Sequence, residues 1–280
     1  MIRKRVLILA ACGFMAGAAM PAVAPLHLMQ IEQVIGGVNG DVTAQAIQLR
    51  LRANGECFVS DGKLWVRDAA GQNPVLLIDF TTDVPGCNTG DRVLITSPNF
   101  TSLLDNTIQP DFVLTNLIPE SYLAAGTMTF ENNAGAFVFW RLSWGGKNYS
   151  GDTTGATFND ADGEFGPPYE GPLPADSLQA LQFQGPANAP STNNQDDYAL
   201  TKGASTWTNN AGNSGTLVEP SVCPWDFDGS GDVGVSDFLE LLGNWGPCPP
   251  KGDCPADFDG SGDVGVSDFL ELLGNWGPCP

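Results

Sequence analysis

The sequence predicts a mainly β protein in two parts, a β-sandwich over residues 25–218 and a small α-helical module over residues 223–280. Apolar and polar residues alternate in many short runs that Gly, Asn and Pro separate. Charged residues make up only 16% of the chain, while Gly and Pro number 34 and 21. A stretch of 24 residues also occurs twice at the C-terminus. This composition suits a loop-rich extracellular protein better than a helical one.

The first 24 residues have the order of a secretory signal, with a basic start at Met1–Arg5, an apolar run over 6–20 and small residues at 22–24. An alternative makes Leu9–Cys12 a lipoprotein box, with Cys12 carrying the lipid. No later apolar run is long enough to cross a bilayer. We therefore expect a secreted or cell-surface protein without a transmembrane span.

The prediction of a β-sandwich is based on apolar residues that recur at every second position. Ile47, Leu49 and Leu51 alternate with polar residues, as strand residues do when one face is buried. Further strand-like runs lie at 63–67, 75–80, 92–96, 127–130, 136–144, 180–183 and 205–208. Long loops are expected within 184–216, followed by a linker at 219–222. The stretches 31–52 and 63–74 resemble the first strands of lamin-tail-like and other immunoglobulin-like sandwiches of exported bacterial proteins.

Charge and histidine content narrow the chemistry. The formal net charge is −20, which disfavours binding to nucleic acids and to anionic lipids. The single histidine, His27, lies close to the expected mature N-terminus, so triads and histidine-built zinc sites are excluded. Carboxylate chemistry remains, either calcium binding or glycoside hydrolysis by a carboxylate pair.

The C-terminal duplication repeats DFDGSGDVGVSDFLELLGNWGPCP residue for residue at 226–249 and 257–280. Its first twelve residues place oxygen-bearing side chains at the first, third and fifth positions, Asp226, Asp228 and Ser230, and at the twelfth, Asp237. Calcium takes about six to eight oxygens, and a loop of this length supplies them from such positions, the seventh through its carbonyl. Gly231, in the sixth place, suits the sharp turn. Each loop therefore predicts a calcium site.

A short helix is expected after each loop, ending within 243–246. Four apolar residues of the first copy recur at the helical spacing i, i+3, i+4 and i+7, namely Phe238, Leu241, Leu242 and Trp245. One loop–helix unit cannot bury such a face alone, so we expect the two copies to pack together. Val233, in the eighth position, is expected to pair with its counterpart in the other loop.

The two copies together resemble a type I dockerin, the duplicated calcium-loop module of secreted bacterial proteins, over about the last fifth of the chain. The nearest match is a Cys-framed variant that serves as a surface-anchoring tag. The resemblance implies two calcium ions held by Asp226, Asp228, Ser230, Asp232 (main chain), Asp237, Asp257, Asp259, Ser261, Asp263 (main chain) and Asp268. Dockerins usually carry Asn and Asp in the third and fifth places, where this chain has Asp and Ser. Their partner-contacting residues correspond to Val235–Ser236 and Val266–Ser267.

Six cysteines remain beyond the signal, and an even number in an exported chain favours disulfides. Cys223 to Cys248 and Cys254 to Cys279 have the same separation of 25 positions, which favours one bridge inside each copy. Cys57 and Cys87 are then left to pair in the front domain. Zinc is the alternative, but no two cysteines have CxxC spacing.

Acidity in the repeat predicts order that depends on calcium. Residues 223–280 hold eleven acidic side chains against one lysine, so self-repulsion should oppose folding without a metal. An acidic, disulfide-pinned disordered tail and thrombospondin-like calcium repeats are alternatives. The apolar face of the expected helices argues against both.

Three groups of residues in the front domain carry alternative functions. Asp160–Glu164 resembles part of a calcium loop, although a solvated acidic turn is the simpler interpretation. Aromatic side chains that could form a sugar-stacking platform are Trp140, Trp144, Trp207 and Tyr149, although aromatic residues in strands more often belong to a core. Carboxylates that could supply a glycosidase pair are Glu120, Glu131, Glu164 and Glu170.

We therefore expect a non-catalytic exported protein whose C-terminal repeats bind two calcium ions and mediate attachment to a partner protein or to the cell surface. The alternative is a carbohydrate-binding or carbohydrate-degrading sandwich carried by the same module. A purely structural envelope protein is a third possibility.

Overall fold

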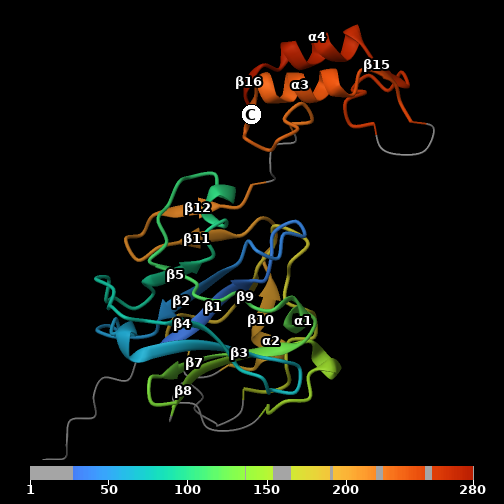
Figure 1. Ribbon diagram of the computed structural model, residues 1–280. Helices are drawn as coiled ribbons and strands as arrows, with labels where there is room; N and C mark the ends of the chain where they lie inside the picture. Colours follow the sequence, from blue (N-terminus) through green and yellow to red (C-terminus); the bar gives the residue numbers. More distant parts are fainter. Residues whose placement is uncertain are drawn as a thin grey trace, which may run out of the picture. The chain divides into compact units, whose positions relative to one another are not determined.

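The computed structural model describes residues 28–135, 137–153, 165–189, 192–218, 223–249 and 254–279. The protein is mainly β, with several sheets and few helices, which confirms the predicted class (Figure 1). The chain divides after Thr216 into two compact units, which we call the β unit and the C-terminal unit. Residues 103–105 group with the C-terminal unit. The expected signal and the linker at 219–222 lie outside the described residues.

The larger sheet of the β unit has six strands, in the order β10-β9-β1-β2-β5-β6. Their bounds are β10 (Tyr198–Leu200), β9 (Leu181–Phe183), β1 (Met29–Ile35), β2 (Ala46–Leu51), β5 (Arg92–Thr96) and β6 (Phe112–Val113). Neighbours are antiparallel except β5 and β6, which run parallel.

The smaller sheet has four antiparallel strands, in the order β4-β3-β7-β8. Their bounds are β4 (Val75–Asp79), β3 (Gly62–Arg67), β7 (Gly126–Asn132) and β8 (Val138–Trp144). Short helices α1 (Glu120–Leu123) and α2 (Asn194–Asp197), and 3-10 turns at Val59–Asp61, Thr101–Leu103 and Gly146–Asn148, lie between the strands.

Both sheets contribute to one hydrophobic core. On β3, Leu64 and Val66 are fully buried, while Lys63, Trp65 and Arg67 are half-buried. This is the period of two that the sequence shows. Ile47 and Leu49 of β2 belong to the same cluster as these two residues. The two sheets therefore form layers that share their apolar faces.

The other face of the six-stranded sheet carries a buried ionic cluster around Glu32. This carboxylate pairs with Arg50 (3.0 Å) and Arg92 (2.7 Å) and accepts a hydrogen bond from Gln48 (2.8 Å). The hairpin of β11 (Thr206–Thr208) and β12 (Ser214–Thr216) covers this face, and its Thr208 N–H donates to Gln48 Oε1 (2.7 Å). Because the core covers one face of β1 and the hairpin covers the other, every residue of this strand is buried. A buried charge needs such partners to offset its lost hydration.

One disulfide, Cys57–Cys87, lies in the β unit. It confirms the pairing expected from the sequence for these two cysteines. Cys57 precedes the 3-10 turn at Val59–Asp61, and Cys87 lies in the loop before β5. The bridge therefore ties two long connections between strands to each other.

Candidate functional site

The C-terminal unit consists of two copies of one loop–helix element, with a helix after each loop as predicted. The elements in chain order are β13 (Asp232–Val233), α3 (Val235–Gly243), β14 (Gly246–Pro247), β15 (Asp263–Val264), α4 (Val266–Gly274) and β16 (Gly277–Pro278). Identical sequence gives both copies the same element lengths.

The short strands pair crosswise between the copies. Val233 lies opposite Gly277 in the β13–β16 pair, and Val264 lies opposite Gly246 in the β14–β15 pair. The prediction that Val233 pairs with its counterpart in the other loop is therefore wrong. Each valine instead pairs with the segment that follows the other copy's helix. Both valines are nonetheless buried in one small core.

The disulfides of this unit also differ from the prediction. Bridges inside each copy, Cys223–Cys248 and Cys254–Cys279, are replaced by Cys223–Cys279 and Cys248–Cys254. The crosswise strands are the physical reason, because they bring the end of each copy against the loop of the other. Cys279 N–H donates to the carbonyl of Gly231 in the first loop (2.9 Å), which carries Cys279 towards Cys223.

Three carboxylates of the first loop lie together, as its spacing predicts. One oxygen each of Asp226, Asp228 and Asp237 lies within 4.8 Å of the others. Asp226 also shapes the loop, since its Oδ1 accepts the N–H of Ser230 (3.0 Å) and its Oδ2 accepts that of Gly231 (2.8 Å). The backbone therefore curls around the carboxylates.

Asp237, the twelfth residue, both closes the loop and begins the helix. It is only 1% exposed. Its Oδ1 accepts the N–H groups of Phe227 (2.7 Å) and Asp228 (3.3 Å), while its Oδ2 accepts that of Gly234 (2.7 Å) at the start of α3. A carboxylate at a helix N-terminus satisfies N–H groups that have no partner within the helix. One side chain thus fixes the loop relative to the helix.

The fifth to seventh residues complete the loop. Ser230 Oγ donates to the carbonyl oxygen of Asp232 (3.0 Å), so the seventh residue turns its main-chain oxygen towards Ser230. Gly231 has a φ of +87°, the left-handed conformation that its place in the loop predicts. The described geometry is compatible with a main-chain ligand at the seventh position.

The second loop repeats this arrangement. Its five predicted residues are Asp257, Asp259, Ser261, Asp263 and Asp268, and the carboxylates of the first, third and twelfth positions again lie within 4.8 Å of one another. Asp268 is 1% exposed and accepts the N–H of Phe258 (2.8 Å) and that of Gly265 (2.8 Å). The same hydrogen bonds recur because the sequence recurs.

Hydrogen bonds also favour the ionised state of the third-position carboxylates. The nearby hydroxyl of Ser230 and its backbone N–H, which donates to Asp228 Oδ1 (3.0 Å), lower the pKa of Asp228 below the ordinary value. Ser261 does the same for Asp259. A lowered pKa keeps a carboxylate charged over a wider pH range, and the charged form is the one that binds a cation.

The available donors suit a hard divalent cation, because they are carboxylate, hydroxyl and carbonyl oxygens. Thiolate ligation is excluded at the cysteines near Asp257, since Cys248 and Cys254 are bonded to each other. Each bridge instead contacts the first carboxylate of one loop. Cys248 Sγ lies 3.6 Å from Asp257 Oδ2, and Cys279 Sγ lies 3.7 Å from Asp226 Oδ2.

The two helices pack through part of the predicted apolar face. Leu241 is fully buried, and the ring of Phe238 lies 5.3 Å from that of Phe269. Leu242 and Trp245, which were predicted to share this face, are 44% and 47% exposed. The two-helix unit is too small to cover a stripe that wide, so that part of the prediction is wrong.

Each helix also keeps exposed apolar side chains, and we call the two sets together the helix face. It comprises Val235, Leu239, Leu242, Trp245, Val266, Leu270, Leu273 and Trp276, which are 44–64% exposed. Val235, Leu239 and Leu242 are spaced i, i+4 and i+7, a helical pattern that could have revealed this stripe from the sequence. Stripes of exposed apolar residues on the helices of a small unit are typical of contact surfaces.

The four aromatic side chains that could have formed a sugar-stacking platform belong to the core instead, which is the interpretation that the sequence favoured. Trp140, Trp144 and Trp207 are at most 1% exposed, and Tyr149 is 7% exposed. Trp140 Nε1 donates to the hydroxyl of Tyr198 (2.8 Å) within the core. These side chains therefore stabilise the fold and cannot stack on a sugar.

The carboxylates named as an alternative glycosidase pair do not form a recognisable pair among the described residues. Glu131 is 7% exposed and forms an ion pair with Arg67 (3.0 Å). Glu120 begins α1 and Glu170 lies in a loop, both exposed. Glu164, and with it the acidic stretch Asp160–Glu164, lies outside the described residues.

No protein-family model matches the chain, and neither a curated protein nor a solved structure is significantly similar to it. In the part of the chain that the structure describes, no helix is long and apolar enough to cross a membrane. The three disulfides indicate folding in an oxidising, extracellular environment.

Proposed function

We propose that the C-terminal unit is a dockerin-like module that binds two calcium ions and, in that state, attaches the protein to a partner protein or to the cell surface. The β unit is then the sandwich-type cargo of this module. The observation that carries the proposal is the pair of identical loops, each with three carboxylates within 4.8 Å of one another. Calcium would supply the positive charge that offsets the repulsion between these carboxylates.

The charge of the unit supports coupling between metal binding and folding. Its small core holds only five buried hydrophobic residues among those described. Eleven acidic side chains against one lysine repel one another in residues 223–280. Cation binding to folded loops reduces this repulsion and adds binding free energy to folding free energy.

The helix face supports attachment. Val235 and Val266 of this face, with the adjacent Ser236 and Ser267, stand at positions that correspond to the partner-contacting residues of dockerins. A protein partner could bury these apolar side chains, and such burial is the main source of free energy in protein association. The two helices that present them are held by the same Asp237 and Asp268 side chains that close the loops.

Calorimetric titration of the full chain with calcium tests the metal sites. We expect two ions per chain, one ion for Asp228→Ala or Asp259→Ala, and none for the double variant. These aspartates are exposed and do not cap the helices, so their loss should remove ligands without breaking α3 or α4.

Asp232→Asn is the matched control, because the seventh residue is expected to ligate through its carbonyl and the change removes the same charge. It should still bind two ions, with affinity reduced only a few-fold by the lost long-range charge. An equal loss of sites in Asp232→Asn and Asp228→Ala would indicate diffuse charge attraction and would contradict the proposed ligand set.

Capture of exported proteins by the immobilised full chain tests attachment. We expect capture in calcium, release by a chelator, and loss in a Leu239→Ser, Leu270→Ser double variant that still binds two calcium ions. Capture that persists after chelation, or in the double variant, would separate attachment from this module.

A further inference from the structure

The outer face of the four-stranded sheet holds a groove that is lined by residues of the β unit. Two hollows of about 320 and 340 Å³ lie along it, and they share Arg67, Glu131 and Gly135 in their linings. We call them together the outer groove. Its floor is formed by the outward residues of β3, β7 and β8, so the groove stands on rigid strands.

Strand register brings an aromatic ring and an arginine to the two sides of this groove. Trp65 of β3 lies opposite Thr129 of β7, and Thr129 lies opposite Arg141 of β8. Two strand spacings, about 10 Å, therefore separate the Trp65 and Arg141 positions. Trp65 is half-exposed, in contrast to the buried tryptophans of the core. A ring of this kind can stack on a sugar.

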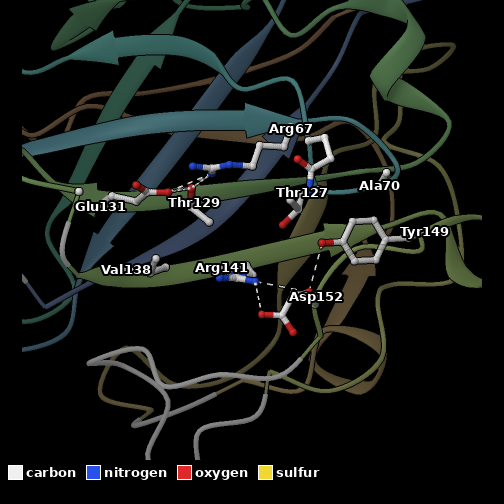
Figure 2. A pocket seen from close by; sticks show the side chains of 12 residues that line it. Arg67, Ala70, Thr127, Thr129, Glu131, Val138, Arg141, Tyr149 and Asp152 are labelled. Carbon is white, nitrogen blue, oxygen red and sulfur yellow. Dashed lines mark hydrogen bonds and ion pairs between the residues drawn. The ribbon is translucent and has the colours of Figure 1, made fainter.

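The two arginines of the groove differ in how they are held (Figure 2). Arg67 Nη1 is satisfied by Glu131 Oε1 (3.0 Å) and by Thr129 Oγ1 (2.8 Å). Arg141 lies over the ring of Phe165, 4.3 Å from its centroid, and the ring offers it no hydrogen-bond acceptor. Its Nη1 donates to the main-chain carbonyl of Asp152 (3.4 Å) and lies 3.7 Å from a carboxylate oxygen of the same residue, whose side chain is 63% exposed.

Arg141 is therefore held in a fixed position, with part of its guanidinium open to the groove. Its side chain is 17% exposed, and its buried Nε has no hydrogen-bond partner among the described residues. Burial lowers the pKa of Arg141, while the nearby Tyr149 and Asp152 partly offset this effect. The exposed part of this guanidinium can bind an anionic acceptor in the groove, and its planar fork matches a carboxylate.

We propose that the outer groove binds an acidic saccharide, with a uronate carboxylate on Arg141 and a neighbouring sugar ring on Trp65. The polar side chains between them, Thr129 and Glu131, would face sugar hydroxyls. The groove is too long for a single inorganic anion and too polar for an apolar ligand. This site lies in the β unit, so it goes beyond the attachment proposed for the C-terminal unit and does not depend on it.

Titration of the full chain with oligogalacturonate tests the proposal, and the methyl-esterified form of the same oligomer is the ligand control. We expect binding of the acid form and little binding of the ester. Arg141→Gln should weaken binding about 10-fold or more, because it removes a charged hydrogen bond. Trp65→Ala should weaken it as well. Lys202→Gln, which removes an exposed charge elsewhere, should change nothing.

Asp152→Asn keeps the test decisive if Arg141→Gln fails to fold, because Asp152 is exposed and competes for Arg141. This variant should bind oligogalacturonate several-fold more tightly. Weaker binding by Asp152→Asn, equal binding of acid and ester, tighter binding of a sulfated oligomer, or no binding of any of these oligomers would each overturn the proposal. The calcium stoichiometry of every variant should remain two, which separates this result from the proposed function.

Discussion

The β unit and the C-terminal unit are stabilised in different ways. Thirty buried hydrophobic residues form one cluster between the sheets of the β unit, whereas the described core of the C-terminal unit holds five. One disulfide lies in the larger unit and two in the smaller. Small units that cannot bury enough apolar surface depend on covalent bridges and metals. The comparison thus predicts which perturbations each unit can tolerate.

Removal of calcium should produce the largest difference in stability between the two units. With free calcium about 100 times Kd, each site adds about 2.7 kcal/mol, so two sites together add roughly 5 kcal/mol. Amide hydrogen exchange measured by region should show lost protection in α3 and α4 and unchanged protection in β3 and β7. Loss of protection in both units would contradict the division.

The unfolding free energy lost when one disulfide of the C-terminal unit is removed should increase with the length of chain that this disulfide closes. Cys223–Cys279 spans 56 residues and Cys248–Cys254 spans 6. Loop-closure entropy then gives about 4 kcal/mol for the first and about 2 kcal/mol for the second. Denaturant unfolding of the two double Cys→Ser variants in saturating calcium measures both. The reverse order would show that contact of each bridge with Asp226 or Asp257 matters more than loop length.

In the β unit, the buried ionic cluster should be the sensitive point. Glu32→Gln leaves Arg50 and Arg92 without their carboxylate and should cost about 3 kcal/mol of unfolding free energy. Asp79→Asn, which breaks a more exposed pair with Lys63, should cost under about 1 kcal/mol. Thermal unfolding of both variants tests the difference, and similar losses would refute it.

The smallest effect on stability is expected at the helix face. Leu239→Ser changes an exposed residue and should alter the unfolding free energy by about 0.5 kcal/mol or less. Leu241→Ala, two positions along the same helix, empties a fully buried site and should cost about 2–5 kcal/mol. Denaturant unfolding in saturating calcium compares them, and a large loss for Leu239→Ser would mean that its side chain supports the fold.

Local pattern predicted the strands well and the long-range pairing poorly. Leu64 and Val66 are predictable because their period of two depends only on neighbouring residues and one buried face. The same holds for Gly231, whose left-handed conformation follows from its place in the loop. The loop carboxylates also come together as their spacing predicts.

Contacts between the copies could not be predicted in this way. Equal spacing favoured Cys223–Cys248, but the partner of Cys223 is set by the crosswise pairing of β13 and β16, which has no signal within one copy. The alignment of Arg141 with Thr129 and, one strand further, with Trp65 likewise depends on the register of three strands. A sequence read segment by segment contains neither relation.

The crosswise closure makes the C-terminal unit suitable as an insertable cassette. Its first and last cysteines are bonded, with Cα atoms 5.8 Å apart, so the two ends of residues 223–279 lie close together. Domains with adjacent ends can be placed in a surface loop of a host protein without stretching it. Residues 223–279 could therefore be moved into an exposed turn of an unrelated exported protein and transfer their binding properties with them.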